Sequence, residues 1–262
     1  MRIDVHTHAF HHKIAVKATE QLERHYKHPV KGTGTKEDLL SFMDRTKIDK
    51  AFVHSAATTP EQVIPANNWA ISLLENNRFI PFGTLHQDYV DWENELNRLE
   101  KHGIKGLKFH CDFQGFDLDS KKMFPIYEAI SGRFIVTFHI GDVLPPDKNP
   151  SSPQKLANIL RNFPALTAIA AHFGGIFHWQ WVKESLSGFN FYMDTSSTLE
   201  FIPDHLMNEI LNSFPEDFFL FGSDYPLGDP VTELRLLKEK AKFSDDKIER
   251  LLTRGAKLLG LG

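Results

Sequence analysis

Short runs of aliphatic, aromatic and β-branched residues recur along this chain, and segments with helical periodicity separate them. The runs cover residues 2–8, 50–57, 79–86, 104–110, 134–141, 166–173, 189–197 and 218–224. Their spacing is close to the roughly 30 residues of one strand-plus-helix unit. Several runs are apolar throughout, which is typical of parallel strands covered on both faces. The pattern therefore predicts an α/β fold in which residues 1–262 form one domain, a distorted (β/α)8 barrel.

The interval after the first predicted strand is longer than the others and contains an additional amphipathic segment over residues 15–26. Because it follows a strand, this helical segment emerges at the carboxyl-terminal end of the barrel strands, where barrel enzymes have their active sites. It is either a surface helix or subunit contact, or a cap over a substrate. A Pro-rich loop over residues 142–150 is predicted to cover the same end. Ser152 and Pro153 then predict the start of a helix, as its N-cap and first helical residue.

Composition and charge narrow the class of protein. Thirty basic and 34 acidic residues leave a net charge of −4 without a long tract of one sign, which argues against nucleic-acid or anionic-membrane partners. The first residues lack an apolar signal core, and no run approaches the roughly 18 apolar residues of a spanning helix, so we expect a cytoplasmic protein. The lone Cys111 excludes an internal disulfide and a Cys-based metal cluster. A small-molecule partner is favoured, and a homodimer is left open.

Candidate chemistry begins with His6 and His8, which alternate along the first strand and so point to one side of it. By itself the pair means little, because 14 His in 262 residues would give roughly 0.7 such pairs by chance. Its significance comes from His139, His172 and Asp224, which stand near the ends of later predicted strands. Burying several imidazoles and a carboxylate in one barrel mouth is costly unless they bind a shared charge.

Neutral imidazoles and a carboxylate suit Zn²⁺, and an open coordination position would let the ion lower the pKa of bound water to about 7. We therefore expect one divalent ion per chain, with Zn²⁺ favoured. Asp4 faces the same way as His6 but lies deeper, so a structural hydrogen bond is the better interpretation of this residue. Four further histidines are interpreted as core or surface groups: His25, His28, His102 and His205. His11 and His12 receive the same interpretation, although they follow the first strand closely.

The combination of Asp-x-His-x-His on strand one, His on strands five and six, and Asp in a Gly-Ser-Asp-Tyr-Pro turn on strand eight resembles the amidohydrolase superfamily. The chain is most similar to its second amidohydrolase family, the group related to aminocarboxymuconate semialdehyde decarboxylase. The resemblance implies a mononuclear metal site formed by His6, His8, His139 and Asp224. It also implies that His172 lies beside the metal as a catalytic or second-metal residue.

Strand four leaves one question open, because Lys108 and His110 share a facing toward the predicted barrel mouth. In dihydroorotase-like members of the superfamily, a Lys on this strand is carbamylated and bridges two metals. The plainer interpretation is an unmodified Lys108 that pairs with a carboxylate or contacts an anionic substrate. We expect the unmodified residue and one ion, or two ions if Lys108 is carbamylated. The nuclease branch typically has Glu at this position, so its absence argues against DNA hydrolysis.

Signals for the substrate are weak. His54 and His86 end strands two and three, and Trp179 follows strand six, so these three are candidate substrate-binding residues. The leading hypothesis is a metal-dependent hydrolase of a small amide, lactone or related carbonyl, in which Asp224 transfers a proton and His172 stabilises the oxyanion. The alternative is a nonoxidative decarboxylase of a small unsaturated or aromatic acid. A noncatalytic metal-binding scaffold is the third hypothesis.

Overall fold

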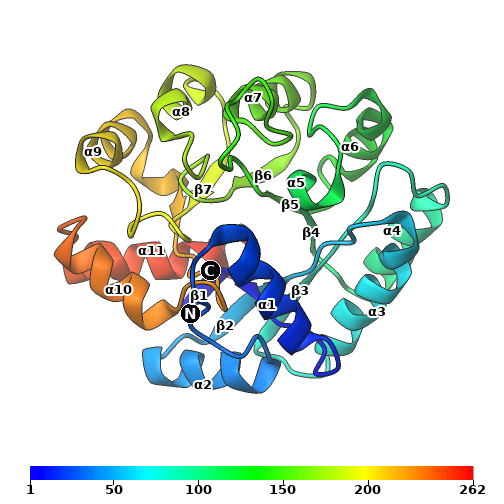
Figure 1. Ribbon diagram of the computed structural model, residues 1–262, viewed down its shortest axis with the longest axis horizontal. Coiled ribbons are helices and arrows are strands. Elements are labelled where there is room, and N and C mark those ends of the chain that lie inside the picture. The colour runs from blue at the N-terminus through cyan, green and yellow to red at the C-terminus, as the bar shows by residue number, and fades with distance from the viewer. Residues whose placement is uncertain (262) are drawn as a thin grey trace.

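Eight parallel strands surround a common axis in the computed structural model, which describes residues 1–261 (Figure 1). Neighbouring strands follow the chain order from first to last, and each pairs with the next in parallel. The strands are β1 (Ile3–His8), β2 (Lys50–His54), β3 (Phe79–Gly83), β4 (Gly106–Phe109), β5 (Ile135–Phe138), β6 (Thr167–Ala170), β7 (Tyr192–Asp194) and β8 (Phe219–Leu220). The predicted (β/α)8 barrel is thus confirmed.

The barrel closes between β1 and the segment that follows β8. The backbone N–H of Val5 donates to the carbonyl of Phe221 at 2.8 Å, and that of His8 donates to Tyr225 at 2.7 Å. In the other direction, the N–H of Asp224 donates to the carbonyl of His6 at 2.8 Å. These bonds place Asp224 beside β1, although the two lie at opposite ends of the sequence.

Helices cover the outside of the barrel, as their one-sided apolar patterns require. The described helices, of which α1 lies at the end of the barrel instead, are α1 (Ala15–Tyr26), α2 (Lys36–Thr46), α3 (Val63–Leu73), α4 (Trp92–Lys101), α5 (Cys111–Gln114), α6 (Phe124–Ile130), α7 (Pro153–Asn162), α8 (Trp179–Leu186), α9 (Asp204–Ser213), α10 (Pro230–Glu239) and α11 (Asp245–Leu258). Helix α11 shows how closely they pack, because a Cβ atom on Gly255 would lie only 2.9 Å from the Val5 side chain. A glycine is needed where this helix crosses β1.

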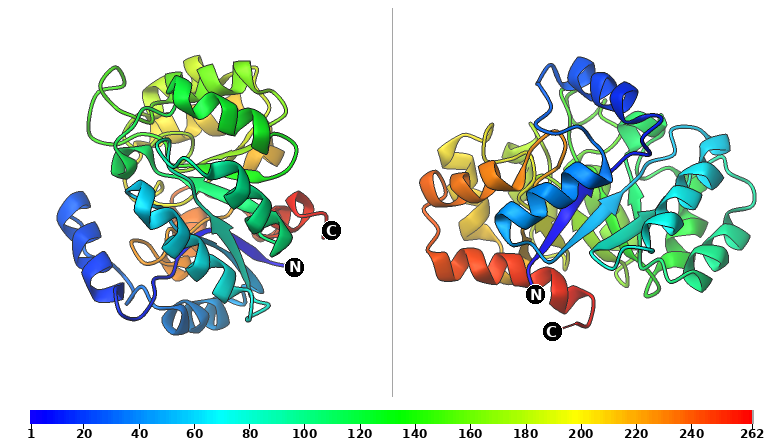
Figure 2. Two further views of the ribbon diagram at one scale, coloured as in Figure 1. Left: turned by 90° about the vertical axis from the view of Figure 1, so that its right-hand side faces the viewer. Right: turned by 90° about the horizontal axis from the view of Figure 1, so that it is seen from below.

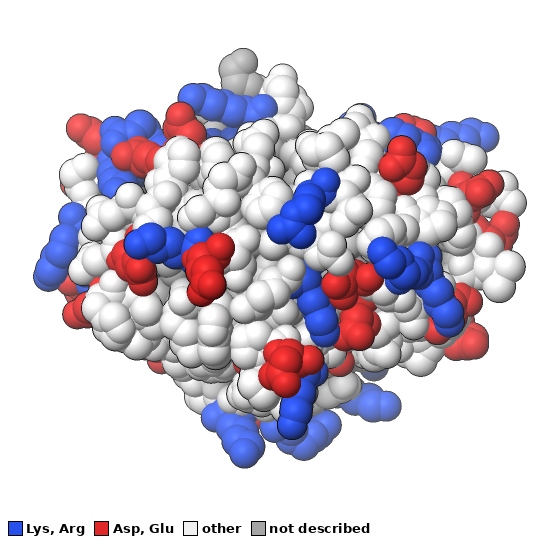
Figure 3. Space-filling model, turned by 90° about the horizontal axis from the view of Figure 1, so that it is seen from above, with Lys and Arg blue, Asp and Glu red and all other residues white. Residues whose placement is uncertain are grey.

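The predicted additional helix over residues 15–26 is α1, and its bounds agree with the prediction. Figure 2 shows that α1 lies at the end of the barrel opposite to the two chain termini. Ser152 occupies the N-cap position of α7 as predicted, with Pro153 in the first turn, but its hydroxyl makes no capping hydrogen bond. None of the described helices is long and apolar enough to cross a membrane. On the face in Figure 3, acidic and basic side chains are interspersed.

The strands are shorter than the apolar runs that predicted them. Each predicted run contains a strand, but most ladders stop earlier; the run 189–197 contains only Tyr192–Asp194, and the run 218–224 only Phe219–Leu220. The apolar character continues because the loops after these strands are themselves buried. In those loops the chain bends sharply, and His172 and Asp224 have φ values of 61° and 58°. Left-handed backbone is uncommon for residues other than glycine and clusters at functional sites.

Candidate active site

A cavity of about 150 Å³ lies between α1 and the carboxyl-terminal ends of the strands. Its walls are largely apolar and include Phe10, Leu22 and Phe113, whereas its floor is made by histidines, Lys108 and Asp224. Such a cavity, with apolar walls and a few convergent polar groups, is the usual form of a small-molecule site.

His6 is held in one tautomer at this floor. Its Nδ1 lies 2.8 Å from Oδ2 of the fully buried Asp194. Because an ionised carboxylate only accepts hydrogen bonds, Nδ1 carries the hydrogen and Nε2 presents its lone pair. Burial, and then the charge of Lys108, lowers the pKa of His6 well below its usual range. The ring is therefore neutral.

The close approach of β1 to β8 depends on Gly222. A Cβ atom at this position would lie 2.9 Å from the Cβ of His6 and 3.2 Å from that of Asp194. Glycine in the Gly-Ser-Asp-Tyr-Pro turn therefore leaves room for the His6–Asp194 pair, and the following residues place Asp224 over the floor.

Asp224 brings the two strand-one histidines together. Its Oδ1 lies 3.5 Å from Nε2 of His6 and 3.4 Å from Nε2 of His8. Its other oxygen accepts a hydrogen bond of 2.5 Å from the hydroxyl of Ser197. Burial by itself raises the pKa of Asp224, but the imidazoles of His6 and His8 outweigh it and hold that pKa well below its usual range. Asp224 is therefore an ionised donor group beside the imidazoles of His6 and His8.

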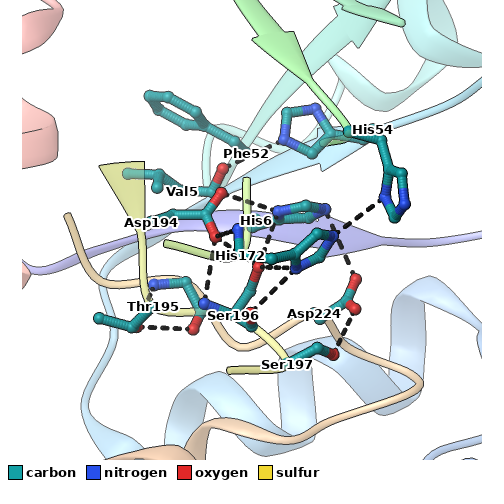
Figure 4. Close-up of polar contacts among 12 residues, drawn as sticks. Val5, His6, Phe52, His54, His172, Asp194, Thr195, Ser196, Ser197 and Asp224 are labelled. Carbon is teal, nitrogen blue, oxygen red and sulfur yellow. Dashed lines mark hydrogen bonds and ion pairs between the residues drawn. The ribbon is translucent and has the colours of Figure 1, made fainter. Parts of the chain in front are cut away.

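His172 is oriented in the same manner as His6 (Figure 4). Its Nδ1 lies 2.9 Å from the backbone carbonyl of Ser196, which can only accept, so Nδ1 carries the hydrogen. The Ser196 hydroxyl donates to Asp194 and can therefore only accept from the Nδ1 atoms of His6 and His172, each at 3.0 Å. Both rings consequently turn an Nε2 lone pair inward.

His139 lies apart from the group formed by His6, His8 and Asp224, whose donor atoms lie within 4.8 Å of one another. Its Nδ1 is instead 3.0 Å from Nε2 of His172. Its Nε2 is buried and has no hydrogen-bond partner among the described residues. Two further groups of donor atoms therefore lie beside the first: His172 with His6 and Asp194, and His139 with His110 and Asp112.

Lys108 lies between these groups, with a side chain that is 1% exposed. Its Nζ is 3.2 Å from Nε2 of His6. Burial lowers the pKa of Lys108 to about 8, although the carboxylates of Asp194 and Asp224 act in the opposite direction. Around neutral pH this amine is mostly charged, and it loses its charge more readily than an exposed lysine.

These observations test whether a divalent ion fits the site. Histidines that bind metals usually donate their outer ring N–H to a carboxylate or a backbone carbonyl, which fixes the tautomer and aims the other nitrogen inward. His6 has this arrangement with Asp194, and His172 has it with Ser196. The donor set of neutral imidazoles and one ionised carboxylate fits a divalent ion.

The other predicted residues have different positions. His110 lines the cavity, and its Nε2 lies 3.2 Å from the hydroxyl of Tyr26 on α1. His54 packs edge-on against His6 with ring centroids 5.0 Å apart, and its Nε2 contacts the carbonyl of Val5 at 3.1 Å. The structure places His54 behind the floor rather than in the described lining of the cavity.

His86 and Trp179 also lie outside the described lining of the cavity. The Nε2 of His86 contacts the carbonyl of Gln114 at 3.0 Å. The indole N–H of Trp179 donates to the carbonyl of His172 at 3.0 Å, so this side chain supports the loop that carries His172. Asp4 accepts hydrogen bonds from the backbone N–H groups of His6 and Ser223, in agreement with the structural interpretation.

Sequence reasoning missed Asp194, Ser196, Ser197 and Tyr26. A signal for Asp194 was present, since it stands at the end of a predicted strand and the ends of parallel strands meet at one edge. Ser196 and Ser197 follow it closely in the same run. Tyr26 carried no such signal, because helical periodicity does not reveal which barrel residue a helix contacts.

The barrel, with its metal-type donor groups at the carboxyl-terminal strand ends, defines the class of protein. Residues 3–260 match the sequence profile described as amidohydrolase. The chain belongs to the amidohydrolase family and is an enzyme, which confirms the family predicted from the strand-end motif. None of the curated proteins compared with the chain is significantly similar to it in sequence.

Solved structures of other proteins share the fold of this chain. An uncharacterized TIM-barrel protein from Bordetella bronchiseptica has a TM-score of 0.77 at 16% identity and covers 99% of this chain and 98% of its own. A 5-carboxyvanillate decarboxylase from Novosphingobium aromaticivorans, complexed with manganese and 4-hydroxy-3-methoxy-5-nitrobenzoic acid, has a TM-score of 0.73 at 18% identity, covering 100% and 96%. A putative 2-pyrone-4,6-dicarboxylic acid hydrolase from Pseudomonas putida has a TM-score of 0.70 at 16% identity, covering 99% and 97%.

Proposed function

We propose that this enzyme is a divalent-metal-dependent hydrolase of a small, uncharged carbonyl compound such as a lactone or amide. The observation that carries the proposal is the convergence of the Nε2 atoms of His6 and His8 on Oδ1 of Asp224, at the floor of an apolar cavity. His139 and His172 supply further imidazole nitrogens beside this group. Zn²⁺ suits the imidazoles, and Mn²⁺, present in the Novosphingobium structure, is the alternative ion.

A divalent ion bound there would polarise the substrate carbonyl and make water acidic enough to attack near neutral pH. Asp224 is placed for proton transfer, because Ser197 holds its Oδ2 atom while its Oδ1 atom lies beside the Nε2 atoms of His6 and His8. It would take a proton from the attacking water and return it to the leaving group. His172 is less suited to the predicted oxyanion contact, since its Nδ1 directs a hydrogen outward to the carbonyl of Ser196 and its Nε2 contacts Nδ1 of His139.

The charges that line the cavity indicate which charge the substrate can carry. Lys108 is the one lysine or arginine in the described lining, and it lies at the floor against His6. The apolar walls therefore offer no cation to a spectator carboxylate, which favours an uncharged substrate body. A dicarboxylate would leave at least one charge facing apolar side chains, which is costly.

Nonoxidative decarboxylation is the second candidate, and the position of Lys108 favours it. A monocarboxylate would direct its charged group to Lys108, the only lysine or arginine among the described lining residues. Lys108 lies at the floor of the cavity, where the carbon–carboxylate bond would be cleaved. The fold similarity to a 5-carboxyvanillate decarboxylase supports the same alternative. Asp224 would then handle the proton at the carbon that loses CO₂.

A substrate panel separates the two reactions. The protein is stripped with a chelator, reloaded with Zn²⁺ or Mn²⁺, and incubated with lactones, primary amides and phenolic monocarboxylates. Acid release from the lactones in a pH-stat, or ammonia release from the amides, supports hydrolysis, and CO₂ release from the phenolic monocarboxylates supports decarboxylation instead. His8→Ala is the control, since it removes a proposed metal ligand at the edge of the site. Failure to retain metal, together with no turnover of any compound, would contradict the proposed function.

A further inference from the structure

Tyr26, in the last turn of α1, makes a polar contact at the candidate site. Its hydroxyl lies 3.2 Å from Nε2 of His110, which follows β4. The adjacent His25 contacts Oδ2 of Asp142 at 3.1 Å, in the Pro-rich loop after β5. The last turn of α1 is thus held to two different loops of the barrel mouth.

The hydroxyl hydrogen of Tyr26 is available to a ligand if His110 is the donor in their contact. Nδ1 of His110 is buried without a hydrogen-bond partner among residues 1–261, and an orphaned N–H is rarer in proteins than an orphaned acceptor. The favoured tautomer therefore carries its hydrogen on Nε2 and donates it to the Tyr26 oxygen. Burial, reinforced by Asp142, raises the pKa of Tyr26 well above its usual range, so the phenol stays protonated. Tyr26 thus supplies an inward hydrogen-bond donor, whereas His172 directs its Nδ1 hydrogen outward to the carbonyl of Ser196.

Tyr26 also belongs to the walls of two cavities. The larger one, of about 150 Å³, lies toward Lys108 and His110, and a smaller one of about 40 Å³ lies toward Phe177 and Phe201. Both reach the same floor, because His139, His172 and Asp224 line each of them. Tyr26 is the one residue of α1 that lines both.

The smaller cavity has features of a built compartment. Phe177, at its rim, has a φ of 59°, a left-handed conformation that is strained for a bulky side chain and clusters at functional sites. Its ring lies 6.0 Å from that of Phe201, which in turn contacts His28 edge-on at 5.4 Å. Since one water needs about 10–15 Å³ of such volume, the compartment holds about three waters, or a group of two or three non-hydrogen atoms.

We propose that Tyr26 determines substrate specificity by dividing the site into two unequal compartments and donating a hydrogen bond to the substrate group at the shared floor. The inference rests on the proposed function and specifies its substrate class. The substrate has a bulky apolar part for the larger compartment and a short group for the smaller one, on either side of the reacting carbonyl.

Hydroxamic acids test the proposal without turnover, because they chelate divalent ions and can carry a group on each side. Calorimetry measures the binding of acetohydroxamic, benzohydroxamic and N-phenylbenzohydroxamic acids to the Zn²⁺-loaded protein. The wild type should bind benzohydroxamic acid and discriminate against the N-phenyl compound, which needs both compartments to be large. Tyr26→Ala should reduce that discrimination at least tenfold. Tyr26→Phe should keep it but weaken benzohydroxamic acid by about two- to tenfold, the range of one lost hydrogen bond.

Leu22→Ala is the matched control, since Leu22 lies on the same helix and lines only the larger cavity. The proposal that Tyr26 divides the site would be overturned if Tyr26→Ala discriminated against N-phenylbenzohydroxamic acid as strongly as the wild type does. It would also be overturned if Leu22→Ala reduced that discrimination as much as Tyr26→Ala does. If acetohydroxamic acid fails to bind the metal-loaded wild type, the proposed function fails. A crystal structure of the metal-free wild type then decides about Tyr26 separately: its hydroxyl beside His110 supports the division, and α1 displaced from the mouth contradicts it. Circular dichroism establishes that each variant is folded.

Discussion

The imidazole of His6 donates its Nδ1 hydrogen to Oδ2 of Asp194 across 2.8 Å, and both side chains are almost completely buried. The carboxylate also accepts backbone N–H bonds from His172 and Ser196, each at 3.1 Å. Asp194 therefore links β1, β6 and β7 beneath the floor, and it sets the direction in which His6 presents its free nitrogen.

Asp194→Asn should lower the affinity for Zn²⁺ by about 10- to 100-fold, the usual effect of losing an outer partner of a metal-binding histidine. The amide can no longer enforce the inward lone pair of His6. Competition with a chromophoric chelator measures the affinity. Asp229→Asn is the control, since Asp229 accepts hydrogen bonds from the backbone N–H groups of Val231 and Thr232 at the start of α10 and belongs to none of the described groups of metal-type donors. Equal affinities in the two variants would remove Asp194 from this role.

His6→Ala and His8→Ala should each abolish tight metal binding while the fold survives, because the apolar core between barrel and helices does not include these rings. Elemental analysis measures the metal, and circular dichroism measures the fold. Full metal content in the double variant would refute the proposed site.

Asp224→Asn should retain metal but lose most turnover of any substrate found in the panel. The amide keeps a weak oxygen donor, whereas it cannot act as a base near neutral pH. Turnover and metal content are measured on the same preparation. Comparable turnover would exclude Asp224 from proton transfer, and loss of the metal would make it chiefly a ligand.

We expect one tightly bound ion per chain, with Lys108 unmodified. A second ion at the His139–His172 pair would need a group that bridges it to the first ion, and a carbamate on Lys108 could supply one. Metal stoichiometry after purification with bicarbonate and excess Zn²⁺ provides the test. Two ions in the wild type that fall to one or none in Lys108→Met would establish the dinuclear alternative.

Asp4 should make the metal-free protein less stable as the pH rises. Burial raises its pKa from 3.8 to about 7 in the folded state, so the unfolded chain ionises first. The contribution of Asp4 is full below pH 4 and is lost progressively between about pH 4 and 7, by an amount of the order of a few kcal/mol. Urea unfolding at pH 5 and pH 7.5 measures it. Asp4→Asn should flatten this dependence, and an equally steep loss in the variant would show that another group is responsible.

Much of this protein follows from its sequence because parallel strands share one edge. The recurring apolar runs predict the barrel, and His6, His8 and Asp224 then meet at its carboxyl-terminal end. The predicted helix over residues 15–26 follows equally from its one-sided pattern and lies at the same end. Local periodicity and chain direction suffice for these conclusions.

Only the tertiary structure decided which atoms face one another. The strand ladders stop before the apolar runs do, and the left-handed turns at His172 and Asp224 set side-chain directions that an extended strand would not give. His139 therefore faces His172 rather than the His6–His8 pair. The contact of Tyr26 with His110 joins residues 84 positions apart, and helical periodicity contains no information about it. Such pairings depend on how separate elements pack, which no local pattern of residues encodes.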